Sequence, residues 1–251
     1  MKAELNEAGG YRFLPAIEPY SSGVVAADGY AIEHVSLRRP VPFAQGLSLV
    51  DDELRRRDRP RQALCNVQLR SPAPFSFGGF SQFNAEYHRF LVAWDLLVDG
   101  VNPVARTNVA PQTGAPPEPS LFGFSFTRSG ADPGAPPSFA VAGAGEVVDG
   151  RLEPEAVVRR GDTSQDGLLA KADYVIGEMA RRMDALGVPH ELATRVNVYT
   201  VHPVDGIVRD LLVRRLGSVP LHGVHLYHSR PPVREIEFEM DLRGVQSEWT
   251  V

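Results

Sequence analysis

The feature that most constrains the fold is an internal repeat. The segment Cys65-Asn-Val-Gln-Leu-Arg-Ser-Pro72 parallels Val196-Asn-Val-Tyr-Thr-Val-His-Pro203, with Asn and Val in the same register and a proline closing each segment. Apolar residues alternate with polar ones from Ala63 to Leu69, which predicts a β-strand with one apolar face. A repeated strand of this kind indicates two copies of one supersecondary unit, and 251 residues accommodate two domains of ordinary size.

The order of the other predicted elements matches in the two halves. In the first half we expect a hairpin turning at Asp28-Gly29, and in the second a hairpin with a turn at Asp149-Gly150. The remaining predictions are helices over 45–57, 80–94, 168–186 and 207–216, and strands over 102–109, 121–126, 195–201, 219–227 and 236–242. We therefore expect an α+β protein of two domains, residues 1–128 and 129–251, each a mixed sheet covered on one face by two helices. Residues 128–138, rich in proline and glycine, are predicted to be the linker.

The clearest candidate functional residue is Arg106, which lies in a short apolar stretch between Ala105 and Val109. A guanidinium on a half-buried strand needs an anionic partner or several acceptors to offset its desolvation. Two interpretations stay open: a structural salt bridge, or a fixed fork that binds the carboxylate of a small ligand.

Composition excludes several classes of protein. The chain is 43% hydrophobic and 23% charged, as in ordinary globular proteins, and its net charge of −5 leaves no broad basic surface, so nucleic acid is not an expected partner. The single cysteine, Cys65, rules out an internal disulfide and a cysteine-based metal site. No apolar run approaches the ~18 residues of a membrane span, and the N-terminus lacks a signal-peptide core, so we expect a cytoplasmic protein without a membrane partner.

The short motifs around Tyr20, Tyr87 and Arg106 in the first half, and around Asp162 and Glu237 in the second, together resemble those of the Rid family. The best-known members of this family, also called YjgF-like, hydrolyse reactive enamines and imines derived from amino acids. In the first half, the family's Gly-Pro-Tyr-Ser motif, Asn-x-x-Tyr helix and Pro-Ala-Arg strand are similar to Ala16-Ile-Glu-Pro-Tyr-Ser21, Phe83-Asn-Ala-Glu-Tyr87 and Val104-Ala-Arg106. In the second half, the Gly-Asp-x-x-x-Gln element and the terminal strand are similar to Arg160-Gly-Asp162 with Gln165 and to Val233-Arg-Glu-Ile-Glu237. The resemblance covers residues 11–128 and 138–244 and implies a tandem pair of Rid-like, chorismate-mutase-like domains.

The resemblance also implies roles for individual residues. Arg106 would bind the substrate carboxylate, and Glu118 would take the place of the glutamate that positions the hydrolytic water. The expected pocket residues are Tyr20, Asn84, Tyr87 and Asn108. Other interpretations stay open: Tyr20 as a core aromatic residue, Asn84 as a helix-to-loop hydrogen bond, and Glu118 as a surface acid.

The chain departs from the family at two positions. The arginine position of the second half falls on Leu221-His222, and the Ser-Gly of the family hairpin is replaced around His34, which is either a general acid/base or a surface residue. His222, His225 and His228 recur at every third residue, so on a strand His225 would face away from the other two and no metal site is expected. A pocket between the halves would bring Arg106 close to His222, Tyr227 or Glu237 and form a composite site, in which His222 and Glu237 are catalytic candidates.

The function implied by the resemblance is a cofactor-independent deaminase or related hydrolase that acts on a small carboxylate-bearing enamine or imine, such as an aminomuconate-like compound. An imine carbon is already electrophilic, so its hydrolysis needs a carboxylate anchor, a positioned water and a group that moves the proton. Two alternatives stay open: a chorismatase-like hydrolase or lyase, and a ligand-binding protein without turnover. Because family members form trimers, we expect a homo-oligomer, with a trimer favoured over a dimer.

Overall fold

The computed structural model describes residues 2–16, 20–148, 151–217 and 219–251. Within these ranges the fold is a mixed α+β architecture with one large sheet and four α-helices. The helices are α1 (Phe43–Arg56), α2 (Phe77–Ala93), α3 (Gln165–Leu186) and α4 (Asp205–Leu216). The strands are β1 (Glu4–Asn6), β2 (Tyr11–Phe13), β3 (Gly23–Ala26), β4 (Tyr30–Pro42), β5 (Leu64–Arg70), β6 (Ala105–Pro111), β7 (Ser120–Ser129), β8 (Phe139–Gly145), β9 (Arg195–Thr200), β10 (His225–Arg230), β11 (Glu239–Gly244) and β12 (Ser247–Thr250).

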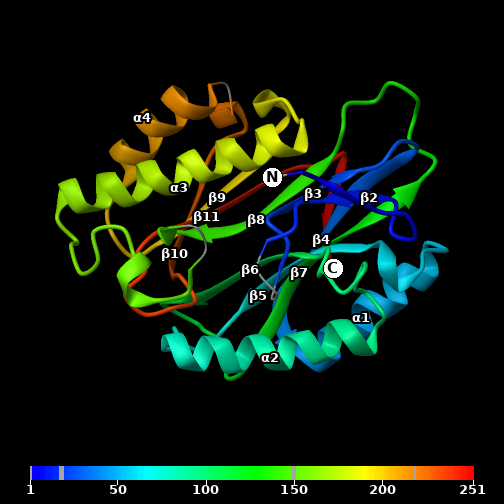
Figure 1. Cartoon of the computed structure of the whole chain (residues 1–251), viewed down its shortest axis with the longest axis horizontal. Coiled ribbons are helices and arrows are strands. Elements are labelled where there is room, and N and C mark those ends of the chain that lie inside the picture. The colour runs from blue at the N-terminus through cyan, green and yellow to red at the C-terminus, as the bar shows by residue number, and fades with distance from the viewer. Residues whose placement is uncertain (1, 17–19, 149–150, 218) are drawn as a thin grey trace.

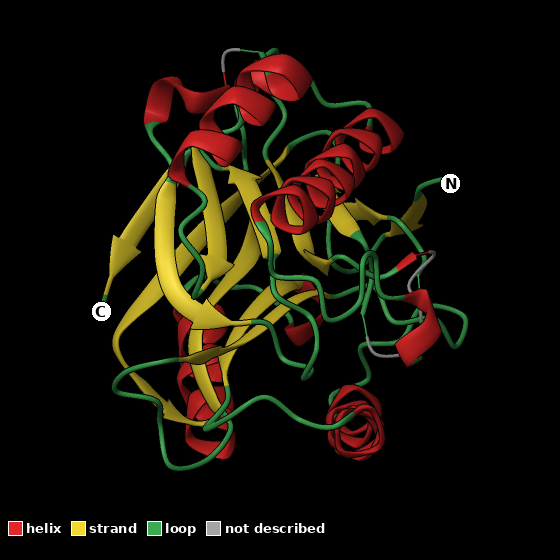
Figure 2. Cartoon of the chain, turned by 90° about the vertical axis from the view of Figure 1, so that its left-hand side faces the viewer, coloured by secondary structure: helices red, strands yellow, loops and turns green. Residues whose placement is uncertain are grey.

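The sheet runs in the order β1-β2-β3-β8-β11-β9-β10-β6-β5-β7-β4-β12 and lies between two pairs of helices (Figure 1). In Figure 1, α3 and α4 lie above the strands and α1 and α2 lie below them, and Figure 2 shows the same layers from the side. One apolar core joins α3 and α4 to β8, β9 and β11, and a second joins α1 and α2 to β4, β5 and β7. A third cluster, which includes Phe13, Ile32, Cys65 and Ala142, fills the space between the two halves of the sheet. Each pair of helices therefore covers the outer face of its own half of the sheet.

The helix predictions are confirmed, and their ends follow from local chemistry. α3 begins after Ser164, whose Oγ accepts the N–H of Gly167 at 3.2 Å, and it ends at Gly187, which has a left-handed backbone with φ of 69°. α2 begins after Ser76, which caps Gly79 in the same way at 3.1 Å. Serine caps and a closing glycine satisfy backbone groups that a helix cannot pair internally.

The hairpin expected at Asp28-Gly29 does not form. The Asp28-Gly29 turn is present, with φ of 79° at Gly29 and a hydrogen bond from the Tyr30 N–H to the Ala27 carbonyl at 3.0 Å. However, β3 pairs with β2 and β8, whereas β4 pairs with β7 and β12, so the turn carries the chain from one half of the sheet to the other. In the second half β8 pairs with β3 and β11, and the expected turn at 149–150 lies outside the described residues.

The strand expected over 219–227 is shorter than predicted. Val219–His222 is a 3₁₀ helix, labelled η5, and β10 begins only at His225. Gly223 separates the two with φ of 82°, a conformation that extended strands do not contain. His222 is therefore exposed in η5 and does not occupy a strand position equivalent to that of Arg106.

Both ends of the chain cross to the opposite half of the sheet. β1, β2 and β3 extend the half that α3 and α4 cover, because β3 pairs with β8. β12 pairs in parallel with β4 at the other edge, where the Trp249 ring packs 4.8 Å from the guanidinium carbon of Arg57. Residues 130–138, within the predicted linker, connect β7 and β8 without a helix or strand. None of the described helices is both long enough and apolar enough to cross a membrane.

Candidate functional site

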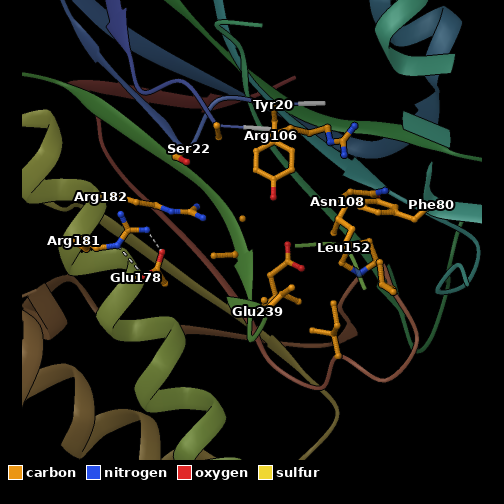
Figure 3. A pocket seen from close by; sticks show the side chains of 18 residues that line it. Tyr20, Ser22, Phe80, Arg106, Asn108, Leu152, Glu178, Arg181, Arg182 and Glu239 are labelled. Carbon is orange, nitrogen blue, oxygen red and sulfur yellow. Dashed lines mark hydrogen bonds and ion pairs between the residues drawn. The ribbon is translucent and has the colours of Figure 1, made fainter. Parts of the chain in front are cut away.

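A cavity of about 330 Å³ lies where the two halves meet (Figure 3), which is within the size range of small-ligand pockets. One wall comes from β6 and α2, and the other from β8, β11 and α3. The polar residues that line it include Tyr20, Ser22, Arg106, Asn108, Glu178, Arg181, Arg182 and Glu239. The site therefore combines side chains from both halves of the chain.

Arg106 is a buried cation in the wall of this cavity, and only 3% of the residue is exposed. Its Nη2 donates to Oδ1 of Asn84 at 2.7 Å, whereas Nη1 is buried and has no hydrogen-bond partner among the described residues. The Tyr87 ring centre lies 4.7 Å from the guanidinium carbon, and the Tyr20 and Phe80 rings lie 5.5 Å away. Burial lowers the pKa of Arg106, although an arginine stays charged at neutral pH.

The salt-bridge interpretation of Arg106 is not supported. No carboxylate oxygen of the described residues lies within 4.0 Å of the Arg106 guanidinium, the distance that defines an ion pair. Aromatic faces stabilise the cation and restrict its rotation, and Asn84 fixes one side of the fork. What remains is a preorganised donor, Nη1, that lacks an acceptor.

Glu239 on β11 is a buried acid in the same cavity, with 4% of the residue exposed. Burial raises its pKa well above the ordinary value; the carboxylates of Asp241 and Glu146 add to this effect, while Arg106 and Arg182 oppose it. Its Oε1 lies against the backbone of Gly143, where a Cβ atom would approach to 2.4 Å. A raised pKa favours the protonated acid, which is the form that can donate a proton to a bound ligand.

A second buried cation, Arg182, enters the cavity from α3 (Figure 3). It is 8% exposed, and its Nη1 donates to the Ala142 carbonyl at 3.0 Å, while its Nε has no partner among the described residues. Burial lowers its pKa as well. Its neighbour Arg181 differs, because it forms an ion pair with Glu178 at the rim.

The structure brings all five expected substrate-binding residues together. Tyr20 and Asn108 line the cavity beside Arg106, and Figure 3 shows the Tyr20 hydroxyl directed toward Glu239. Asn84 and Tyr87 lie behind Arg106 and hold it. Asn108 is itself fixed, because its Oδ1 accepts from the Ser71 hydroxyl at 3.0 Å.

The four expected catalytic residues lie outside the cavity. Glu118 is exposed in the loop before β7, and His222 is exposed in η5. His34 is buried on β4, with Nδ1 2.9 Å from the Ser125 hydroxyl, and burial lowers its pKa well below the ordinary value. The Glu237 carboxylate lies 2.8 Å from Nε2 of His202. The expected composite site of Arg106 with His222, Tyr227 or Glu237 therefore does not form, because β10 starts after His222 and Glu237 turns toward His202.

Glu239, the acid that does reach the cavity, was not among the expected residues. The strand itself carries a signal for it, because Phe238, Met240 and Leu242 alternate with charged residues and pack into the core beneath α3 and α4. The alternating face then consists of Glu239, Asp241 and Arg243, all at most 5% exposed. Three buried charges on one face of a strand indicate either a paired network or a site.

Arg182 was also missed, and helix periodicity offers the signal. It follows Val175 by seven residues and Met179 by three, so it lies at the edge of the apolar face of α3. An arginine at such a position either extends its head to solvent or enters a site.

The described residues contain no group of three or more His, Cys, Asp or Glu side chains placed to hold a metal ion.

Comparison with known proteins assigns the chain to a family. Residues 3–249 match the family model described as 2-aminomuconate deaminase CnbZ. A protein of Comamonas testosteroni named 2-amino-5-chloromuconate deaminase is 41% identical over 241 residues, which are 96% of this chain and 95% of that protein. Among solved structures, cyanuric acid hydrolase is 12% identical with a TM-score of 0.41, covering 88% of this chain and 69% of that one. A Thermotoga maritima protein titled as an endoribonuclease is 17% identical with a TM-score of 0.33, over 55% of this chain and 91% of that one. On the evidence of the match over nearly its whole length, the chain belongs to the 2-aminomuconate deaminase CnbZ family.

Proposed function

We propose that this chain is a deaminase that hydrolyses an aminomuconate-like enamine, through its imine tautomer, to a 2-oxo acid and ammonia. The observation that carries the proposal is that one cavity holds two buried groups: Arg106, whose Nη1 has no hydrogen-bond partner among the described residues, and Glu239, an acid whose pKa is raised by burial. The family match and the relative named 2-amino-5-chloromuconate deaminase support the same reaction and substrate class.

Arg106 binds the carboxylate next to the reacting carbon in this proposal. Nη2 of Arg106 already donates to Asn84, so Nη1 is the group that donates a hydrogen bond to the substrate carboxylate. A charge-assisted hydrogen bond in a buried site holds a carboxylate firmly and fixes the carbon beside it. Binding of this kind converts the hydrolysis into a reaction between positioned groups.

Glu239 moves the protons in this mechanism. The protonated acid first donates to a carbon of the enamine, which becomes an iminium ion, and Glu239 becomes a carboxylate. Water then attacks the iminium carbon while Glu239 takes its proton, which gives a carbinolamine. Glu239 next protonates the amine nitrogen, the carbon–nitrogen bond breaks, and the hydroxyl proton returns to Glu239 as the carbonyl forms. The sum is enamine plus water to ketone plus ammonia, with the acid regenerated.

Ammonia release from an aminomuconate-type substrate tests the proposal. We expect Arg106→Ala to lower kcat/KM by roughly 10²-fold or more, because a buried charge pair with the substrate is lost. We expect Glu239→Gln to lower kcat by about 10²–10⁴-fold, because the amide cannot cycle a proton. Glu191→Gln, an exposed substitution of the same chemistry, is the matched control.

Two outcomes would contradict the proposal. Tight binding without ammonia release would favour the alternative of a ligand-binding protein. Turnover that survives both Arg106→Ala and Glu239→Gln in folded protein would place the reaction elsewhere, and turnover of a chorismate-like ether instead would favour the chorismatase-like alternative.

We also infer that the chain is a tandem pair of Rid-like domains, residues 1–128 and 129–251, that forms a homo-oligomer. Two helices and a separate apolar core in each half support the pairing. Exchange of β3 and β12 between the halves would make each domain depend on the other. Light scattering tests the assembly: with a chain of 27.5 kDa, a trimer or a dimer is expected, and a monomer would contradict the inference.

A further inference from the structure

We propose that Arg182 binds the far carboxylate of the substrate while Arg106 binds the near one, so that the cavity selects dicarboxylates. The inference rests on the proposed function, because it assigns the other end of the same substrate. A muconate-type molecule carries a carboxylate at each end of its carbon chain, and a site for it needs two separate cations.

The position of Arg182 on α3 explains how its charge reaches the cavity. Val175, Met179 and Met183 of α3 are fully buried in the core beneath the helix. Arg182 lies at the edge of this apolar face and is 8% exposed, whereas 53% of the Arg181 side chain is exposed. The helix thus buries Arg182 in the cavity and leaves Arg181 half-exposed at the rim.

Neither Arg106 nor Arg182 forms an ion pair with a carboxylate of the described residues. Among the described residues, Arg182 has the Ala142 carbonyl as its hydrogen-bond acceptor, and no carboxylate lies within 4.0 Å of its guanidinium. Glu178, on the same helix, is paired with Arg181. Arg106 and Arg182 are 3% and 8% exposed, and Nη1 of Arg106 and Nε of Arg182 have no hydrogen-bond partner among the described residues. Because burying a charge without a close partner is costly, a ligand with two negative charges would offset both.

The arrangement of the two arginines suits a ligand held at both ends. Arg106 comes from β6 and Arg182 from α3, and Figure 3 shows their guanidinium groups on either side of the Tyr20 ring, with Glu239 below its hydroxyl. Both cations act on the pKa of Tyr20 and on that of Glu239, which places both close to these two groups. A dicarboxylate that spans the two cations would lie beside Tyr20 and Glu239, where the proton transfers occur.

A matched pair of unreactive ligands tests the inference by binding alone. trans,trans-Muconate and sorbate share one diene chain but carry two carboxylates and one, respectively. Calorimetry should show that the wild-type protein binds muconate about 30-fold or more tightly than sorbate, which corresponds to a buried charge pair of about 2 kcal/mol. Arg182→Met should remove this preference and leave sorbate affinity within about threefold, and Arg182→Lys should retain part of it.

The control removes a similar charge on another helix surface. Arg209 on α4 pairs with Asp210, and 73% of its side chain is exposed, so Arg209→Met should leave both affinities unchanged. Thermal unfolding confirms that each variant is folded, and Arg182→Lys keeps the charge should Arg182→Met fail to fold.

Three results would overturn the inference. The wild-type protein could bind muconate and sorbate with equal affinity, it could bind neither ligand, or Arg182→Met could lose affinity for both ligands to the same extent. Because these ligands are not turned over, the result does not depend on catalysis. A wild-type protein that prefers muconate but releases no ammonia would refute the proposed function and leave the dicarboxylate site in place.

Discussion

Replacement of Lys171 by Met should destabilise the protein strongly, because it would leave the buried carboxylate of Glu146 without its cation. Lys171 and Glu146 have fully buried side chains, with Nζ 3.0 Å from Oε1, and Nζ also donates to the Val158 carbonyl at 2.9 Å. Glu146 in turn accepts the backbone N–H groups of Glu237 at 2.7 Å and Phe238 at 3.0 Å. The pair therefore joins α3, the segment after β8 and the approach to β11, which carries Glu239.

The magnitude follows from the burial of both partners. Removing one member of a fully buried ion pair costs about 3–5 kcal/mol, since the other charge stays desolvated. For a chain of this size about 1 kcal/mol moves the melting temperature by roughly 2–4 °C, so Lys171→Met should lower Tm by roughly 6–20 °C. Urea unfolding and differential scanning calorimetry at about pH 7 measure both quantities.

The pH dependence of the same variant gives a second, independent check. Burial already raises the pKa of Glu146, and Lys171 opposes this rise, so the variant should have a still higher folded pKa. A carboxyl whose folded pKa exceeds its unfolded one favours the folded state fully below the unfolded pKa, and this contribution is lost as pH rises through the folded value. The stability deficit of Lys171→Met should therefore shrink as the pH is lowered from about 7 toward 5.

A double variant separates the effect of the unpaired Glu146 charge on stability from the effect of lost packing around Lys171. Lys171→Met with Glu146→Gln removes the charge and keeps an oxygen acceptor for one of the two backbone N–H groups, so it should recover part of the lost stability. A single-variant deficit below about 1 kcal/mol, or a double variant no more stable than the single one, would refute the reasoning.

Three further predictions concern the cavity itself. Gly143→Ala would place a Cβ 2.4 Å from the Glu239 carboxyl oxygen, so kcat should fall at least about tenfold in steady-state ammonia assays; an unchanged kcat would contradict the assigned position of the acid. Because burial raises the folded pKa of Glu239, the wild-type protein should lose stability relative to Glu239→Gln as pH rises through that value, and parallel stability curves in urea unfolding would be inconsistent with this. Asn84→Leu removes the acceptor of Arg106 Nη2, so it should cost about 1–3 kcal/mol of stability and raise KM; a variant with unchanged stability and KM would show that Asn84 does not hold the guanidinium.

Much of this protein follows from its sequence because the signals are local. The apolar spacing of Leu168 to Leu186 and the glycine after it define α3 without any knowledge of its partners. Arg106 was identified from an arginine in an apolar strand, and the motif around Tyr87 led to the residues that surround it. Side-chain alternation and helix periodicity depend on neighbours a few residues away, so the residues themselves specify them.

Tertiary structure alone decided how these elements combine. Asp28-Gly29 forms its turn, yet β3 and β4 join different halves of the sheet, because pairing depends on the strands that lie alongside and not on the turn. Which of Glu237 and Glu239 lies in the cavity likewise depends on long-range packing. The Glu237 carboxylate contacts His202, whereas Glu239 lines the cavity between the halves. The sequence by itself determined the four helices, most of the strands and the burial of Arg106 on one of them, since these depend on nearby residues. The acid beside that arginine, and Arg182 across the cavity, were decided only by the way two distant halves of the chain close on each other.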